Sequence, residues 1–385
     1  MTYRLTCLTP LLVGDGNKLA PIDYMVWKDQ VNVLDQRRIF RLLAKGPRLE
    51  GYLVQLKKAD KLDFASWGGF AQNFADRRIA FEHPSAAQCW DRAQGESLFI
   101  PTFASGVDGP YLPATAIKGA LRTAMFFGNL KPGSVEALAQ RFQGDRPPRR
   151  PAEMAEEEAL GPGGGSRMRG VSLGDSAPIT RETMRVYLVR VATLLPAKGA
   201  APFVLGWKQS PRGAAGADRP GESTAWFAEM AAPGTVFSGK WGERHSGSKG
   251  RFRPADRATV FRAANQYAAH ILDVHLRYAA WTGLTHLEAS LRSLREKLDA
   301  LDPAHACLLP LGWGGGLLSK TPWKGVESPE TNDYARILAR LPYYARAVQS
   351  GLPFPKTRRV VFLENQPAAL PGWSVLEVAE NAPAS

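Results

Sequence analysis

Cysteine and histidine are too few and too scattered in this sequence to predict a metal centre or a disulfide framework. The 385 residues include three cysteines and six histidines, with no Cys-x-x-Cys pair and no His-Glu-x-x-His motif. His270 and His275 are five residues apart, which separates them by about 140° around a helix and off any shared metal-binding face. We therefore expect no metal and no cofactor, and the scarcity of cysteine favours a reducing cytoplasm.

The sequence also lacks the long apolar runs of a membrane protein. No stretch approaches the roughly 18 uninterrupted apolar residues of a spanning helix, and MTYRLTCLTPLLVGDG does not read as a secretory leader. Acidic residues are in short supply as well, because 36 Asp and Glu face 49 Lys and Arg and leave a net charge of +13. We expect a cytoplasmic protein with no membrane partner, and the positive charge favours a polyanion, above all nucleic acid.

What the sequence does contain is a mixture of strand and helix patterns. Strands are predicted at the N-terminus, in a hairpin over residues 23–35, and in later runs such as RVYLVRVATLL and TVFSGKW. Apolar residues at three/four spacing predict helices over residues 256–278 and 287–301. Strands and helices do not alternate as in a doubly wound sheet. The predicted fold class is therefore α+β, with antiparallel sheets and helices on one face.

Two segments poor in core residues interrupt the chain. Residues 144–167, GDRPPRRPAEMAEEEALGPGGGSR, combine prolines, glycines and a block of acids, and residues 208–223 are equally poor in core residues. Such composition is typical of a mobile insertion or a linker. Because 385 residues are long for one domain, two domains are expected. Shorter elements are predicted at residues 37–45 (helix), 97–102 (strand) and 332–348 (helix).

A glycine-rich segment, GWGGGLLSKT, lies at residues 312–321. It is one residue short of the phosphate-binding G-x-x-x-x-G-K-[ST] loop, because Ser319 stands in place of the second glycine. Two leucines inside the loop also argue against a nucleotide-hydrolysing site. A plain flexible turn is the alternative, although Trp313 and Trp323 flank the segment. The loop can let another backbone come close and follow a phosphate chain through Gly312, Gly314, Gly315, Gly316 and Lys320.

A second candidate lies in YLPATAIKGALRTAM, residues 111–125. Thr115 is the predicted N-cap of a helix that begins directly after it. Lys118 and Arg122 are four residues apart, so they share a face near the helix N-terminus, where a phosphate would also meet free N–H groups and the positive dipole end. Gly119 costs a helix about 1 kcal/mol, which favours close approach of a ligand there. The alternative is a surface helix with two solvated cations.

A third glycine element, LTPLLVGDGNK, carries Gly14 and Gly16 in the loop after the first strand. Taken together, LTPLLVGDG, YLPATAIKGALR and LGWGGGLLSKT resemble the motifs of the RAMP proteins of type III CRISPR effector complexes. RGVSLGDSAPI and AEMAAPGTVFSGKW resemble two further segments of that family, and the later FPKTRRVVF and LPGWSVLEV point to the fifth Csm subunit of type III-A complexes. The sequence departs from the usual Gly-Ser-Ser of the middle motif, where it has Ala114, Thr115 and Ala116.

The resemblance implies two ferredoxin-like (RRM-type) modules side by side, with helical insertions and a C-terminal glycine-rich loop. We place them at residues 1–143 and 168–385, joined by the insertion at 144–167. It also implies a non-catalytic subunit that caps the backbone filament and holds the 3′ part of the CRISPR RNA for antiviral defence. Its neighbours would be the repeated RAMP backbone subunit and the small helical subunit, with target RNA met indirectly. The residues expected to contact RNA are Gly14, Gly16, Lys118, Gly119, Arg122, Gly312, Gly314, Gly315, Gly316, Ser319 and Lys320.

Other functions remain open from the sequence. Some RAMP proteins cleave CRISPR RNA precursors, which needs a general base or acid near the ribose 2′-OH, usually a histidine. His305 is the histidine to test first, whereas His270 and His275 read as packing or flanking residues. Asp108 is the one acid near the middle motif, and a turn role is expected for it. A backbone or cap subunit of the Cmr type, and a scaffold that binds only proteins, are further alternatives.

Overall fold

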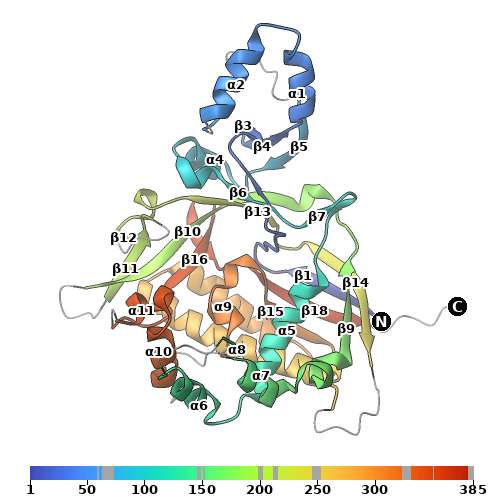
Figure 1. Ribbon diagram of the computed structural model, residues 1–385, viewed down its shortest axis with the longest axis vertical. Coiled ribbons are helices and arrows are strands. Elements are labelled where there is room, and N and C mark those ends of the chain that lie inside the picture. Colours follow the sequence, from blue (N-terminus) through green and yellow to red (C-terminus); the bar gives the residue numbers. More distant parts are fainter. Residues whose placement is uncertain are drawn as a thin grey trace, which may run out of the picture.

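Two antiparallel sheets form the body of the molecule, and a smaller lobe projects from it (Figure 1). The computed structural model describes residues 1–58, 60–62, 73–144, 149–150, 152–197, 203–210, 216–244, 253–322, 331–349 and 351–379. The first sheet has the order β15-β18-β1-β14-β9. Its strands are β1 (Thr2–Cys7), β9 (Val171–Ser176), β14 (Val236–Glu243), β15 (Ala306–Pro310) and β18 (Trp373–Ala379).

Strand β1 lies near the centre of the first sheet because its alternate residues are apolar. Tyr3, Leu5 and Cys7 are buried, while the residues between them face away from the core. It pairs with β14 on one edge and β18 on the other, so the two ends of the chain meet in one sheet. Since β1 and β9 are both antiparallel to β14, they run parallel to each other on either side of it. The sheets therefore do not follow the boundary placed at residue 143.

The second sheet is built around the long strand β10, whose apolar run makes it central. Strand β10 pairs with β16 along one edge, and with β11 and β13 along the other. The strands are β10 (Met184–Pro196), β11 (Phe203–Lys208), β12 (Gly216–Ala217), β13 (Trp226–Ala231), β16 (Thr357–Leu363) and β17 (Gln366–Ala369). Every strand pair of both sheets is antiparallel across the described ranges, as the α+β prediction requires.

The projecting lobe has its own sheet and its own small core. The predicted hairpin is confirmed as β3 (Tyr24–Trp27) and β4 (Gln30–Leu34), joined by Lys28 and Asp29 at φ 49° and 57°. The lobe continues with α1 (Gln36–Leu43), α2 (Arg48–Lys58), β5 (Ala75–Ala80) and α4 (Pro84–Asp91). Its core contains Met25, Leu34, Ile39, Leu43, Tyr52 and Leu62. Leu42, which lies between the buried Ile39 and Leu43 of α1, is half exposed.

The two long helices fall where the apolar spacing predicts them. Helix α8 (Arg257–Thr282) is capped by the Asp256 carboxylate, which accepts from the Thr259 N–H at 2.8 Å, and it ends at Gly283 with φ 64°. Helix α9 (Thr285–Asp299) buries its four leucines. Both α5 (Ala114–Asn129) and α9 pack on α8, and α8 packs on β15, so these helices form the layer beside the first sheet. Within the described residues, no helix is long and apolar enough to cross a membrane.

Several local predictions need correction. Helix α5 begins at Ala114 with Pro113 at its N-cap, not after Thr115. Residues 97–102 form the end of a 3-10 turn (Gly95–Leu98) and the two-residue β6 (Ile100–Pro101), which pairs with β2 (Lys18–Leu19). The helix expected at residues 332–348 is two helices, α10 (Thr331–Ala339) and α11 (Pro342–Gln349).

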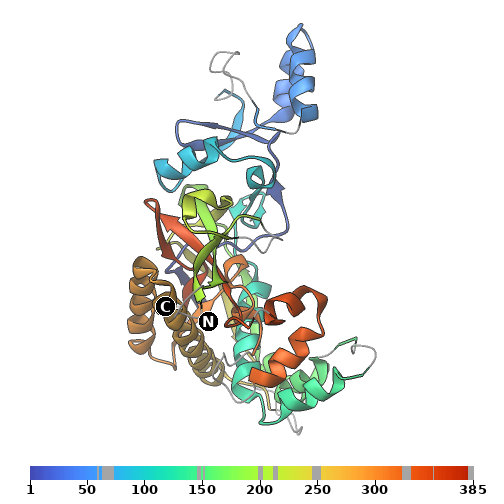
Figure 2. The ribbon, with the colours of Figure 1, turned by 90° about the vertical axis from the view of Figure 1, so that its left-hand side faces the viewer.

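The segment predicted as an insertion is partly ordered into the body. Residues 145–148 and 151 lie outside the described ranges, but α7 (Glu153–Leu160) buries Ala159 and Leu160 and packs on α5. Helix α6 (Ser134–Arg141) precedes it and packs against α10, and these helices lie together at the end of the body far from the lobe (Figure 2). The second predicted break contains β12, with residues 211–215 undescribed.

Candidate nucleic-acid interface

The two glycine loops predicted from opposite ends of the chain lie against each other. The Trp313 N–H donates to the Leu12 carbonyl oxygen at 2.9 Å. Gly312 has φ 74°, and a Cβ there would overlap the same carbonyl oxygen. Gly312 is therefore required because the N-terminal loop occupies the space of a side chain. The glycine-rich loop consists of two 3-10 turns, Trp313–Gly315 and Leu318–Lys320.

The remaining glycines of these loops fall into two groups. A Cβ at Gly314 would overlap Pro371, one at Gly315 would overlap the side chain of Ser319, and one at Gly14 would lie 3.1 Å from the Thr102 carbonyl oxygen. Packing within the chain explains that group. The second group is Gly16 and Gly316, which have φ 94° and 63° and face open space. These two glycines are the ones at which a ligand could approach the backbone closely.

The glycine-rich loop carries one exposed cation and one stacked aromatic residue. Ser319 is buried and its hydroxyl donates to the Gly316 carbonyl at 3.4 Å, so it does not face solvent as a phosphate ligand would. Lys320 is exposed, and its ammonium has no hydrogen bond or ion pair among the described residues. Trp313 is half-buried, with the Arg359 guanidinium 4.4 Å from its ring centre and Nη1 donating to its carbonyl at 3.2 Å. The sequence offered Arg359 only as part of FPKTRRVVF.

The cations of α5 have partners within the chain. Lys118 Nζ donates to the Val171 carbonyl at 2.9 Å, and burial, followed by the nearby Arg244, lowers the pKa of its ammonium. Arg122 pairs with Glu156 of α7 at 2.8 Å on the surface. Gly119 is exposed and a Cβ there would meet open space. The structure therefore places the two cations on one side of α5, each already in contact with another element.

The N-terminus of α5 is closed by a carboxylate. Asp175 Oδ1 of β9 accepts from the Ala114 N–H at 2.7 Å, and the Ser176 hydroxyl accepts from the Leu112 N–H at 2.8 Å. The Asp-Ser pair of RGVSLGDS thus fixes the start of the helix. The carboxylate occupies the position where free N–H groups and the dipole were expected to attract a phosphate. A phosphate would meet the negative charge of Asp175 there. The contact between Asp175 and Ala114 joins residues far apart in sequence, so no local pattern indicates it.

Three histidines lie at separate places in the body. His275 is buried, and its Nδ1 accepts from Arg358 Nε at 2.9 Å, while His270 packs against Phe127 at a tilt with ring centres 5.1 Å apart. His275 therefore packs in the core, as predicted. His305 is exposed and bonds Asp302 Oδ2 at 2.6 Å. Hydrogen bonds from Ala304 and His305 lower the pKa of the Asp302 carboxyl. Strand β15 separates this pair from the glycine-rich loop, and His245 lies outside the described ranges.

Asp108 occupies an exposed two-residue turn between β7 (Ser105–Gly106) and β8 (Gly109–Pro110), the turn role expected for it. The described part of the chain holds no group of three or more His, Cys, Asp or Glu side chains placed to bind a metal ion.

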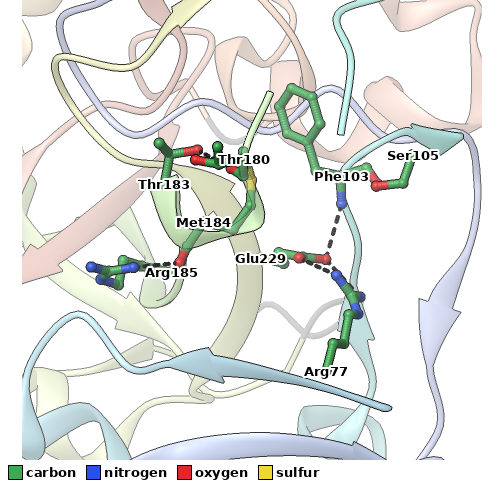
Figure 3. A network of polar contacts seen from close by, with 8 residues as sticks. All are labelled: Arg77, Phe103, Ser105, Thr180, Thr183, Met184, Arg185 and Glu229. Carbon is green, nitrogen blue, oxygen red and sulfur yellow. Dashed lines mark hydrogen bonds and ion pairs between the residues drawn. The ribbon is translucent and has the colours of Figure 1, made fainter. Parts of the chain in front are cut away.

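A buried ion pair joins the lobe to the second sheet (Figure 3). Arg77 of β5 donates to both oxygens of Glu229 in β13, at 2.5 and 3.1 Å, and the Phe103 N–H donates to the same carboxylate at 3.4 Å. Glu229 is fully buried. The lobe also exposes a run of cations that the sequence analysis did not single out, unbroken by any acid: Arg37, Arg38, Arg41, Lys45 and Arg48. The sequence pattern that predicts this cation run is the presence of five cations and no acid over residues 37–48.

Comparisons with known proteins agree with this architecture. The family model of the RAMP superfamily matches residues 4–260. A chain in the cryo-EM structure of a Csm-crRNA-target RNA ternary complex of a type III-A CRISPR-Cas system is similar with a TM-score of 0.65 and 20% identity, over 98% of this chain and 100% of that chain. The crystal structure of T. onnurineus Csm5 gives a TM-score of 0.63 and 17% identity, over 97% of this chain and 99% of that chain.

No curated protein sequence matches this chain. At the identities of the two solved structures, the likeness establishes a shared fold across nearly the whole length. The family model covers well over half of the chain. This chain therefore belongs to the RAMP superfamily, and its fold matches that of Csm5 and of a chain in a type III-A Csm complex.

Proposed function

We propose that this chain is a non-catalytic CRISPR RNA-binding subunit of a type III-A complex, which holds the 3′ part of the guide and caps the backbone filament. The observation that carries the proposal is the likeness over 98% of the chain to a protein seen with crRNA and target RNA. The net charge of +13 supports an RNA partner. We infer that its neighbours are the repeated RAMP backbone subunit and the small helical subunit, with target RNA met indirectly.

The topology supports two ferredoxin-like modules. The order β1–α5–β9–β14–α8–β18 is the β-α-β-β-α-β succession, and its strands lie in the order β18-β1-β14-β9. We infer that this is the first module and that the second sheet is the core of the other. The first module then contains both ends of the chain, and residues around β10 to β13 are inserted within it.

The contacts favour one part of the predicted RNA site over another. Lys320 is exposed and unpartnered within the described ranges. The same loop carries Trp313, whose ring packs on Arg359 and offers a flat surface for a base. Gly316 leaves the backbone open to approach in the same loop. Lys118, by contrast, would have to leave the Val171 carbonyl to reach a phosphate. We propose that the glycine-rich loop is the principal phosphate contact.

A salt titration of RNA binding tests the function. The purified chain and a labelled single-stranded CRISPR RNA are mixed at several salt concentrations, and the dissociation constant is measured. If several phosphates are neutralised, log K falls with log salt at about −0.7 per contact. A chain that binds no RNA at low salt, yet still assembles with the other subunits, would be a protein-binding scaffold instead.

A comparison of lysine variants tests the site. We expect Lys320→Ala to weaken binding and to reduce the salt slope by about 0.7, the contribution of one phosphate contact. Lys118→Ala should weaken binding less, because its ammonium already has a partner. Lys297→Ala, an exposed lysine of α9, is the matched control. Equal binding by Lys320→Ala and Lys297→Ala would contradict the assignment of the loop.

The second candidate function is endoribonuclease activity on CRISPR RNA precursor. His305 and Asp302 are hydrogen-bonded and exposed, as a base and its orienting carboxylate can be. We propose that they do not cleave RNA, because strand β15 separates the pair from the glycine-rich loop. Labelled precursor is incubated with the protein in magnesium or in EDTA. Cleavage that His305→Ala abolishes would establish the enzyme.

A further inference from the structure

A pocket of about 550 Å³ lies between α4 of the lobe and the second sheet. Its walls come from the segment after α4, from the end of β11 and from the stretch before β13. The lining includes the hydroxyls of Ser97, Ser210 and Thr224. It shares no residue with the glycine loops, so it is a separate feature of the molecule. Its volume is in the range of sites that hold small organic ligands, about 300–1,000 Å³.

Arg190 of β10 lines this pocket and is 5% exposed. Its Nη1 donates to the carbonyl oxygen of Ser223 at 2.5 Å and to the hydroxyl of the same residue at 3.1 Å. Nη2 has only the Cys89 sulfur, at 3.8 Å, and the Phe362 ring lies 5.7 Å from the guanidinium carbon. One side of the guanidinium is therefore held by oxygens, while Nε and Nη2 have no oxygen acceptor within the described ranges.

The charge of Arg190 has no balancing carboxylate within the described part of the chain. No described carboxylate forms an ion pair with it, although burying a cation without a partner is costly. Arg92 and Glu96 also line the pocket, both exposed, so the lining has a net positive charge. A planar guanidinium whose Nε and Nη2 lack an oxygen acceptor on one side matches two oxygens of a phosphate. Two phosphate oxygens would neutralise the charge of the Arg190 guanidinium and accept hydrogen bonds from Nε and Nη2.

We propose that this pocket binds a phosphate-bearing ligand of nucleotide size, with the phosphate on Arg190 and the sugar or base among the hydroxyls of the wall. Arg92 adds a second positive charge beside the phosphate. The ligand is a free nucleotide or the phosphorylated end of an RNA strand, which present the same group. The proposal does not depend on the glycine loops, so guide-RNA binding there can fail while this site stands.

Cys89 is a built-in reporter of the pocket. Cys7 and Cys307 are buried, whereas Cys89 is partly exposed and lines the pocket beside Arg190. Its rate of alkylation by iodoacetamide is measured by mass spectrometry in the whole chain. The additions are AMP, adenosine, a 5′-phosphorylated RNA trinucleotide, or the same trinucleotide with a 5′-hydroxyl. We expect AMP or the phosphorylated trinucleotide to slow alkylation at least fivefold, and the two phosphate-free compounds not to.

Variants separate the site from a general effect. In Arg190→Gln the half-protecting concentration should rise at least tenfold, in Arg92→Gln about threefold, and in the distant control Arg41→Gln not at all. Arg190→Lys keeps the positive charge and serves as the test if Arg190→Gln does not fold. Its half-protecting concentration should rise less than that of Arg190→Gln. Protection by AMP identifies a free nucleotide, and protection by the trinucleotide alone identifies a strand end. No protection at millimolar concentrations, equal protection by adenosine, or protection that survives in Arg190→Gln and Arg190→Lys would overturn the proposal.

Discussion

The Arg77–Glu229 pair makes the attachment of the lobe sensitive to a single substitution. The Glu229 side chain is 1% exposed and that of Arg77 15%, so both charges are largely removed from water. In Arg77→Met the carboxylate keeps only the Phe103 N–H at 3.4 Å. Leaving one member of a buried pair uncompensated costs about 3–5 kcal/mol. We expect a loss of that size in the free energy of unfolding, with the lobe loosened first.

Two measurements follow this loss. A urea titration gives the free energy of unfolding. Hydrogen exchange of the β5 amides and of the Glu82 amide reports on the attachment of the lobe, because the Glu82 N–H, just beyond β5, donates to the Val186 carbonyl of the second sheet at 2.9 Å. Arg292→Met is the matched control. It breaks a surface pair with Glu288 whose side chains are 66% and 27% exposed, worth about 0–1 kcal/mol.

A double variant distinguishes charge burial from lost packing. Arg77→Met combined with Glu229→Gln removes both charges and should recover most of the stability, since a buried pair contributes little more than a well-packed neutral replacement. The reasoning is refuted if Arg77→Met costs no more than Arg292→Met. It is refuted as well if the double variant is no more stable than Arg77→Met alone.

Three further predictions concern the body. Gly312→Ala should destabilise the chain by more than 1 kcal/mol in a urea titration, because its Cβ overlaps the Leu12 carbonyl and its φ is 74°; a neutral effect would contradict the loop contact. Leu121→Ala, in the core under α5, should cost about 2–5 kcal/mol in the same assay, and a loss under 1 kcal/mol would contradict its burial. Burial and, as the smaller cause, the charge of Arg358 hold the pKa of His275 well below 6.5. As the pH falls, this imidazole is therefore protonated in the unfolded chain before it is protonated in the folded one. Stability should be complete above pH 6.5 and fall below it by at most about 1.4 kcal/mol per pH unit, a slope that should be absent in His275→Gln.

Much of the local structure could be read from the sequence. The hairpin turn falls at Lys28 and Asp29. The apolar positions at three/four spacing in α8 are all buried: Val260, Ala264, Tyr267, Ile271, Val274 and Tyr278. These features depend on side chains within a few residues of one another, where periodicity and turn chemistry act. Boundaries were less predictable: α5 begins at Ala114 because a carboxylate from β9 accepts its first N–H, which no neighbouring residue indicates.

The sequence predicted many of the residues of the candidate site but not how they are arranged in space. The sequence identified the glycine loops, and the structure brings them into contact through Trp313 and Leu12. It could not show that Gly312 and Gly314 accommodate the chain itself, because the atoms that fill those spaces belong to residues 12 and 371. Arg359 and Arg190 were missed for the same reason, since the significance of each depends on residues distant in sequence.

The sequence by itself determined the fold class, the positions of most helices and strands, the excess of positive charge and the motifs of the RAMP superfamily. All of these depend on composition or on spacings of a few residues. Only the tertiary structure decided that β1 lies between β14 and β18, that Asp175 closes α5, and that the buried charge of Arg190 has no carboxylate partner within the described ranges. Those outcomes depend on pairings across tens to hundreds of residues, where burial and charge balance are set by the packed chain as a whole.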